Sequence, residues 1–286
     1  VLNGDVIRTK NVVWSINANI TWIDNKVLSL PDSRKDYTLN GHEGFINGST
    51  GFIGEGLPMG YIYMVDYAGV NPQTGESQWW KKDVKTIENE DGTTSEKIEW
   101  ITTSDYSNVS SDIDSRKEFG TSMAKVFGGF GTTLYAYGFD LSVAFDYQLG
   151  GKTIDGAYAG YMSSPTSATS GKNYHLDLLG AWKNPDSKLP KDVYQQIPRF
   201  QFADQYTTST SSRFLISSNY LNISNINLGY TFPAKWWNGH IQNLRVYVAC
   251  DNVWYWSARK GLDPRGTGNA NYSPIRTISG GVTLTF

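Results

Sequence analysis

The chain ends in Thr277-Ile-Ser-Gly-Gly-Val-Thr-Leu-Thr-Phe286, ten residues in which an apolar position alternates with a small or polar one without a break. A β-strand points successive side chains to opposite faces, so this segment predicts a strand with one apolar and one polar face. A closed outer-membrane barrel can end on such a strand, because its last strand pairs with its first and leaves no edge. Taken alone, the segment is equally compatible with the last strand of a soluble sandwich.

The composition indicates an all-β protein. The chain has 286 residues, enough for one large β domain or two smaller ones. Aromatic residues make up 14 % of it and there are 29 glycines, which is typical of strands joined by many turns. A charged fraction of 18 % and a formal net charge of -2 argue against binding to nucleic acid. The single cysteine, Cys250, excludes a disulfide framework and is interpreted as a small packing residue.

The sequence is compatible with a membrane location without a membrane-spanning helix. It contains no run of 18 apolar residues, the minimum for such a helix. A barrel strand needs only about 9–11 residues, half of them apolar, so a mean hydropathy of -0.41 is no objection. The chain opens at Val1 without a Met or a leader, and Val6 already resembles strand, which predicts that it begins inside a larger protein.

Eight segments are predicted to form strands. The clearest spans 139–149, where Phe139 and the apolar residues after it alternate with Asp140 and other small or polar residues. A shift in alternation near Ser224-Asn225 predicts a β-bulge. Aromatic pairs and triplets at Trp236-Trp237 and Trp254-Tyr255-Trp256 bracket one strand, as the two interfacial belts of a membrane barrel do. The predicted strands are 11–23, 60–69, 76–83, 123–136, 139–149, 220–232, 244–256 and 277–286.

The connections between these segments alternate between short and long. Short turns are predicted at 70–75, 137–138 and 233–243, and long links at 25–58, 84–118, 150–212 and 257–276. Outer-membrane barrels have short periplasmic turns and long extracellular loops, whereas long structureless loops are uncommon in compact soluble domains. The alternation therefore predicts an antiparallel transmembrane barrel whose last strand brings Phe286 to the periplasmic face.

The sequence contains no motif for bond-breaking chemistry. A phosphate-binding loop, a nucleophile elbow and a zinc-protease helix motif are all missing. Asp140 and Asp146 could be considered as a catalytic carboxylate pair, but six positions along a strand separate them by roughly 20 Å. Hydrolysis of a glycosidic bond needs two carboxyl groups less than about 10 Å apart. The prediction is a protein that is not an enzyme, with no cofactor and no metal.

Several motifs follow one another in a fixed order along nearly the whole chain. They include Y-L-N-I-S-N-I-N-L-G-Y-T-F-P at 220–233, L-R-V-Y-V at 244–248, G-L-D-P at 261–264 and Y-S-P-I-R-T at 272–277. Earlier members are N-I-T-W-I-D-N-K-V-L-S-L at 19–30, Y-A-G-V-N-P-Q-T-G at 67–75, Y-G-F-D-L-S-V at 137–143 and D-L-L-G-A-W at 177–182. In this order they resemble the SusC/RagA family of TonB-dependent outer-membrane transporters from Bacteroidetes.

The resemblance implies that the complete transporter is larger than this chain. Members of the family are barrels of about 22 strands plugged by an N-terminal domain. Residues 1–286, with about eight strands, would be the C-terminal part, and the plug and first strands would be absent from it. The resemblance also implies a SusD-like surface lipoprotein as partner and energy from TonB-ExbB-ExbD through the absent N-terminal part. It implies an outer-membrane location and import of oligosaccharides or peptides.

The polar face of the predicted barrel strands supplies the candidate site residues. The lumen-facing candidates are Asn17, Asn19, Thr21, Asp140, Ser142, Asp146, Gln148, Asn222, Asn227, Arg245 and Tyr247. Tyr174 and Trp182 are loop candidates for stacking on sugar rings. Two alternatives stay open at this point, namely a soluble carbohydrate-binding β-sandwich and a free-standing eight-stranded barrel.

Overall fold

The computed structural model describes residues 1–89, 93–166, 171–183, 196–204, 206–237, 240–260, 263 and 274–286. Of the motif residues at 261–264 and 272–277, residues 261, 262, 264, 272 and 273 therefore lie outside the described residues. The chain divides into two compact units. The first, here called the sheet unit, comprises Val1–Asp24, Met123–Thr153 and Ser217–Phe286. The second, the loop unit, comprises Asn25–Ser122 and Ile154–Ile216.

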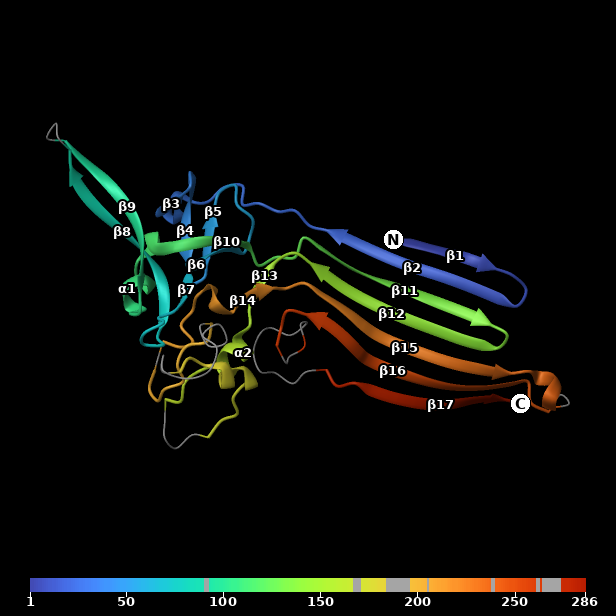
Figure 1. Cartoon of the computed structure of the whole chain (residues 1–286). Helices are drawn as coiled ribbons and strands as arrows, with labels where there is room; N and C mark the ends of the chain where they lie inside the picture. The colour runs from blue at the N-terminus through green and yellow to red at the C-terminus, as the bar shows by residue number, and fades with distance from the viewer. Residues whose placement is uncertain are drawn as a thin grey trace. The chain divides into compact units, whose positions relative to one another are not determined.

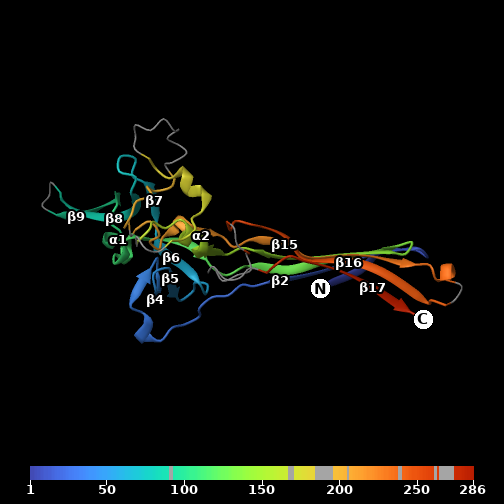
Figure 2. The same cartoon turned by 90° about the horizontal axis from the view of Figure 1, so that it is seen from below.

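The sheet unit is one antiparallel sheet of seven strands, whose spatial order β1-β2-β11-β12-β15-β16-β17 follows their order in the chain (Figure 1). Each strand therefore pairs with the next strand of this unit in the sequence, as in an up-and-down barrel wall. Seen from below, the sheet is a single layer of strands (Figure 2). The strands are β1 (Leu2–Arg8), β2 (Val12–Trp22), β11 (Val126–Ala136), β12 (Phe139–Leu149), β15 (Tyr220–Phe232), β16 (Asn243–Ser257) and β17 (Thr277–Thr285).

This sheet confirms six of the eight predicted strands and corrects two. The segments predicted at 60–69 and 76–83 are extended, but they belong to sheets of the loop unit. Alternation shows that a strand has two different faces, and it does not show which sheet the strand joins. Val6 was expected to be extended, but β1 was not among the eight predicted strands, because its pairing register with β2 shifts between Asp5 and Ile7 and the irregularity breaks the alternation.

The β-bulge predicted near Ser224-Asn225 is confirmed. On β12, Ala144 pairs with Asn225 and Phe145 pairs with Ile223, so Ser224 is the extra residue. The Ser224 hydroxyl donates to the carbonyl oxygen of Ala144 at 3.1 Å. The bulge keeps Ile223 and Ile226 on the same face of the sheet, although they are three positions apart.

The alternation of short and long connections also holds, with corrected members. The short ones are 9–11, 137–138 and 233–242, and the long ones are 23–125, 150–219 and 258–276. The predicted links 25–58 and 84–118 and the predicted turn 70–75 all fall within the first long connection. Because the strands are antiparallel neighbours, every short turn lies at the same end of the strands, here called the short-turn edge of the sheet. The C-terminus lies at this edge too, where the Gln242 amide donates to the Thr285 carbonyl at 2.8 Å.

The two faces of the sheet differ in character. The register places an apolar set on one face, and several of its members are largely exposed. Trp22 is 69 % exposed and Val282 66 %. Other members are Trp14, Ile16, Ile20, Phe130, Leu141, Val143, Phe145, Ile226, Leu228, Val246, Val248 and Ile278. An unpaired apolar face of this extent is what a barrel presents to lipid.

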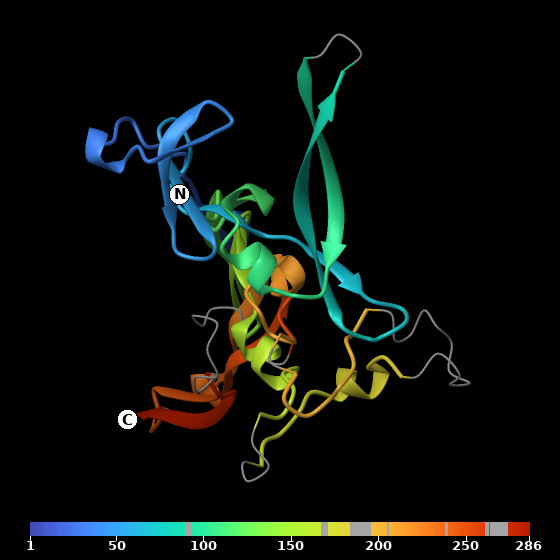
Figure 3. The same cartoon turned by 90° about the vertical axis from the view of Figure 1, so that its left-hand side faces the viewer.

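The loop unit contains two further antiparallel sheets (Figure 1). One has the order β10-β6-β5-β4-β3, and the other has the order β7-β8-β9. Strands β8 and β9 form a long twisted ribbon (Figure 3). The strands are β3 (Tyr37–Leu39), β4 (His42–Asn47), β5 (Gly51–Gly54), β6 (Tyr61–Val65), β7 (Tyr67–Val70), β8 (Ser77–Glu88), β9 (Thr94–Thr103) and β10 (Arg116–Thr121).

Two small hydrophobic clusters hold the loop unit together. Phe52 is buried with Leu39 and Tyr63 in one of them. Trp79 is buried with Val65 and Val109 in the other, and the rings of Tyr67, Tyr106 and Tyr206 surround it at centroid distances of 5.1 to 6.5 Å. Since Tyr206 comes from the second long link, this cluster joins the two links into one unit.

Helices are short throughout the described parts of the chain. They comprise α1 (Ser107–Ser110), α2 (Gly156–Tyr161) and 3-10 turns at Asp32–Arg34, Ile113–Ser115, Leu176–Gly180, Ser212–Phe214 and Ala234–Trp237. Among the described residues, no helix has the length and apolar character needed to cross a membrane. A last pair of short strands, β13 (Lys152–Ile154) and β14 (Leu215–Ser217), forms a two-stranded sheet.

Candidate functional site

The register of the sheet unit brings the predicted polar residues together on one face. All eleven candidates, from Asn17 on β2 to Tyr247 on β16, lie opposite the apolar set. The sequence analysis missed Asn225 and Asp251, which share this face and join at 2.8 Å. The bulge at Ser224 had hidden Asn225, since it moves the polar face from even to odd positions within β15.

An ion pair between Asp140 and Arg245 is the centre of this polar face. Arg245 Nη2 lies 2.5 Å from Asp140 Oδ2, and its Nε donates to Oδ1 at 3.0 Å. The guanidinium also donates to Asn227 Oδ1 at 3.2 Å and lies 5.0 Å from the centroid of the Tyr247 ring. Such a bidentate pair fixes the direction of a long side chain that would otherwise be mobile.

Gly229 makes room for this ion pair. It lies on β15 between β12 and β16, directly opposite Asp140. A Cβ atom at Gly229 would lie 2.5 Å from Arg245 Nη2 and 2.6 Å from Asp140 Oδ1, which is closer than any real side chain tolerates. The missing side chain therefore lets Arg245 cross the intervening strand and reach Asp140.

The attraction between Asp140 and Arg245 is expected to contribute little to the stability of the protein. The variants Asp140→Asn and Arg245→Gln, alone and combined, show the size of this contribution. The side chains are 28 % and 27 % exposed, so solvent screens their attraction, and we expect a coupling energy of about 1 kcal/mol. A double-mutant cycle on urea unfolding of the sheet measures it. Because salt screens an exposed pair, the coupling should fall further in 1 M NaCl. A coupling that salt leaves unchanged would contradict this account.

Further hydrogen bonds on this face involve asparagine side chains. Asn222 Nδ2 donates to Asp146 Oδ1 at 2.7 Å, and Asn19 Oδ1 accepts from the Gly129 amide at 3.1 Å. Among the described residues, no group of His, Cys, Asp and Glu side chains is arranged to hold a metal ion. The arrangement offers hydrogen-bonding partners to water or to a polar solute.

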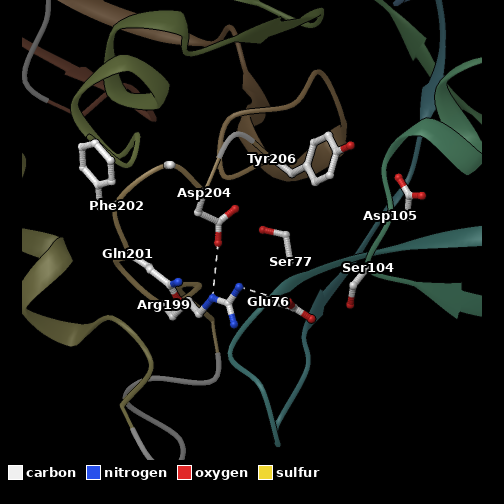
Figure 4. Close-up of a pocket in the computed structure, with 10 residues that line it drawn as sticks. Glu76, Ser77, Ser104, Asp105, Arg199, Gln201, Phe202, Asp204 and Tyr206 are labelled. Atoms are coloured by element: carbon white, nitrogen blue, oxygen red, sulfur yellow. Dashed lines mark hydrogen bonds and ion pairs between the residues drawn. The ribbon is translucent and has the colours of Figure 1, made fainter. Parts of the chain in front are cut away.

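A cleft of about 520 Å³ lies within the loop unit (Figure 4). Arg199 lies on one wall, where its Nη2 is 3.0 Å from Glu76 Oε1 and its Nε is 3.4 Å from Asp204 Oδ2. Its Nη1 donates to the Thr74 carbonyl at 3.2 Å. The guanidinium thus joins the 71–76 turn to the 196–204 segment, which are more than a hundred residues apart in sequence.

The opposite wall of the cleft carries Asp105 and Ser77. Asp105 Oδ1 accepts from the Ser107 hydroxyl at 2.7 Å and from the Ser107 amide at 2.9 Å. These bonds, the hydroxyl first, lower the pKa of Asp105, so the carboxylate remains ionised at neutral pH. Ser77 is buried, and its side chain extends into the space between Asp204 and Tyr206 (Figure 4).

Tyr174 and Trp182 lie away from this cleft. The Tyr174 ring meets Phe200 edge-on at 4.9 Å, with Lys172 Nζ 5.3 Å from its centroid. Trp182 covers the turn at Gly75, where an added Cβ would lie 2.3 Å from its ring, and its Nε1 donates to the Pro72 carbonyl. The short helix between them, Leu176–Gly180, is a 3-10 turn. The geometry gives Trp182 a packing role in the loop unit.

Comparison with known proteins matches the chain over its whole length. No family model matches it. A curated protein of Formosa agariphila, named TonB-dependent receptor P3, is 22 % identical over 309 aligned positions, which cover 100 % of this chain and 28 % of that protein. The structure of the RagAB peptide transporter has 23 % identity and a TM-score of 0.64, and covers 99 % of this chain and 28 % of that one. The RagAB peptide importer in its "open-open" state has 22 % identity and a TM-score of 0.68, with the same coverage of both chains.

The fold is that of a segment of a TonB-dependent outer-membrane β-barrel. The predicted resemblance to the SusC/RagA family is confirmed by both comparisons, and these relatives are receptors and transporters. The chain spans 28 % of the length of the curated relative that it matches.

Proposed function

We propose that this chain forms the C-terminal wall and part of the extracellular loops of a TonB-dependent importer. The single observation that supports this most is the seven-stranded meander with one exposed apolar face and one polar face. The apolar face would contact lipid, and the polar face with Asp140 and Arg245 would line a hydrated lumen. The remaining N-terminal part of the barrel, with its plug, would complete the pore.

The alternation of connections supports an orientation in the membrane. Short turns belong to the periplasmic side of outer-membrane barrels and long loops to the extracellular side. The C-terminus at Phe286 would then face the periplasm, and the links that form the loop unit would leave the sheet on the outside. The aromatic residues near both sheet edges, Trp22 and Trp256 at one and Phe139 and Trp236 at the other, fit the two interfacial belts.

The proposed cargo is a peptide or an oligosaccharide, captured with a SusD-like lipoprotein and imported with energy from TonB-ExbB-ExbD. The similarity to a peptide importer favours peptides. A soluble sugar-binding sandwich would bury the apolar face under a second sheet, whereas the described long strands of the sheet unit form a single sheet.

The importer proposal predicts uptake that depends on TonB. Cells that carry the full-length protein are expected to take up radiolabelled peptide mixtures, and cells that lack TonB are not, because the plug opens only with TonB energy. Uptake measured over minutes, with a strain deleted for the full-length gene as background, checks this. Equal uptake in all three strains would contradict the proposal.

A further inference from the structure

The ribbon of the loop unit ends in a strand with an open edge (Figure 3). β9 is the last strand in the order β7-β8-β9, so among the described strands only β8 pairs with it. The pairing runs over ten consecutive positions, from Trp79 opposite Thr103 to Glu88 opposite Thr94, without a shift of register. The second edge of β9 therefore presents main-chain N–H and C=O groups that another chain can pair with.

Hydrogen bonds at the base of β8 show which backbone groups of β9 point outward. The Trp80 amide donates to the Asp66 carbonyl at 3.0 Å, and the Lys82 amide donates to the Ser115 hydroxyl at 2.9 Å. Both residues therefore direct their backbone away from β9. In an antiparallel ladder, the residues opposite them direct their backbone away from β8 in turn. The outward residues of β9 are Glu96, Ile98, Trp100 and Thr102.

This edge of β9 is accessible along its length. All four outward residues are exposed, and no main-chain hydrogen bond between described residues occupies their backbone groups. β9 contains no proline and its ladder has no bulge, although both are common protections of an open edge. The outer edge of β8 offers less room, since β7 and the bonds to Asp66 and Ser115 take up its base.

The outward residues also give the edge one apolar face. Ile98 and Trp100 point to the same side of the ribbon and are 54 % and 41 % exposed. Lys117 Nζ lies 4.7 Å from the centroid of the Trp100 ring, and Ile98 lies two positions further from the base. A strand placed along β9 would set every second side chain beside these two residues.

The other face of the ribbon has charges that neutralise one another. Glu99 lies 2.7 Å from Lys85 Nζ and 2.8 Å from Lys97 Nζ. Lys97 is the only lysine of β9, and its charge is paired within the ribbon. The edge therefore offers main-chain hydrogen bonds and apolar contact, and little net charge for selecting a charged ligand.

We propose that the outer edge of β9 binds an extended peptide, which adds to the ribbon as a further strand. This inference rests on the proposed function and specifies how its cargo is recognised. Main-chain pairing does not depend on the side chains of the peptide, which suits the import of peptide mixtures. Apolar side chains at alternate positions gain from contact with Ile98 and Trp100. An oligosaccharide has no regular row of N–H and C=O groups for such pairing.

Calorimetric titration of the full-length transporter in detergent tests the inference with N-methylated peptides. The probe is a heptapeptide of alternating Thr and Val whose Thr nitrogens are methylated, so that the Val edge of its backbone can still pair. The matched probe has the same side chains and every backbone nitrogen methylated. We expect the first peptide to bind at least about tenfold more tightly, since several hydrogen bonds are lost in the second. Equal affinity, or no binding of the first peptide, would overturn the inference.

Proline variants locate the site on β9. Ile98→Pro removes an outward N–H and breaks no bond to β8, so we expect at least about tenfold weaker binding of the Thr-methylated peptide. The control Val84→Pro makes the same kind of change directly opposite, on the outer edge of β8, and should leave the affinity within about twofold. Ile98→Thr keeps the N–H and loses apolar surface, and should weaken binding about threefold. Unchanged affinity in Ile98→Pro, or equal losses in both proline variants, would refute the assignment to β9.

Hydrogen exchange shows whether the edge is open in the complete transporter. The amides of Ile98 and Trp100 are expected to exchange rapidly without peptide and to slow when the Thr-methylated peptide is added. Slow exchange before peptide is added would mean that another part of the transporter, or its lipoprotein partner, already pairs with β9, and the inference would fail.

Uptake separates this inference from the proposed function. If peptides enter at the same TonB-dependent rate in cells with the Ile98→Pro transporter, the importer stands and the β9 site fails. If no peptide enters the unmodified strain in a TonB-dependent way, the importer itself fails. TonB-dependent entry that Ile98→Pro slows and Val84→Pro leaves unchanged supports both.

Discussion

Replacing Val143 by Arg is expected to reduce assembly of the barrel severely. Val143 lies near the middle of β12 on the apolar face, where it pairs with Thr132 on one side and Ile226 on the other. An arginine at the middle of a lipid-facing strand costs about 2–4 kcal/mol. The assembled fraction is measured by the mobility of unheated and heated full-length protein on SDS gels, since folded barrels resist unfolding until heated.

Two matched variants show whether the face or the position is responsible. Ser142→Arg places the same charge one residue earlier, on the polar face opposite Asn227, and should leave assembly nearly unchanged. Val246→Arg lies on the apolar face but level with Phe139, near the short-turn edge, and should cost only about 1 kcal/mol. Equal tolerance of Arg at Val143 and Ser142 would show that the apolar face does not meet lipid.

Replacing Trp79 by Ala is expected to destabilise the loop unit by about 3–5 kcal/mol. Trp79 is 1 % exposed and contacts Val65, Val109 and three tyrosine rings, so its removal leaves a large cavity where the two long links meet. Hydrogen exchange of the full-length protein should show faster exchange throughout 61–110 and 206–214, whereas the strands of the sheet unit should keep their protection.

The control for this prediction is Trp100→Ala on the same ribbon. Trp100 is 41 % exposed, and its described contact is with Lys117 Nζ, 4.7 Å from the ring, so a loss of about 1 kcal/mol is expected. If both variants changed exchange to the same extent, the Trp79 cluster would not be the core of the loop unit. Loss of protection in β12 as well would show that the two units unfold together.

The strands of the sheet unit were predictable because each has two chemically different faces. The bounds of β12 and β15 agree with the predicted segments, and those of β2 and β16 differ by one residue at each end. Membership of a sheet was not predictable from the same signal, as the segments at 60–69 and 76–83 show. Their alternation comes from sheets that pack around Trp79 and Phe52, and a local pattern does not identify its pairing partner.

The contacts that make up the two candidate sites join residues far apart in the chain. Asp140 and Arg245 were both predicted for the polar face, but their pairing depends on the register across β15 and on the space at Gly229. The cleft was not predicted. Arg199 and Glu76 are separated by 123 residues, and the cleft forms only because the two long links fold onto one core.

By itself, the sequence determined the class of this protein. It showed strands of barrel length with one apolar and one polar face, joined by short turns that alternate with long links. These are local properties, because the two-residue period of a strand makes its two faces visible in the order of the residues. Only the tertiary structure decided which strands share the wall, which polar side chains pair across it, and that the links build a separate unit with a cleft. Such outcomes depend on hydrogen-bond register and on packing between distant segments, and no local pattern encodes either one.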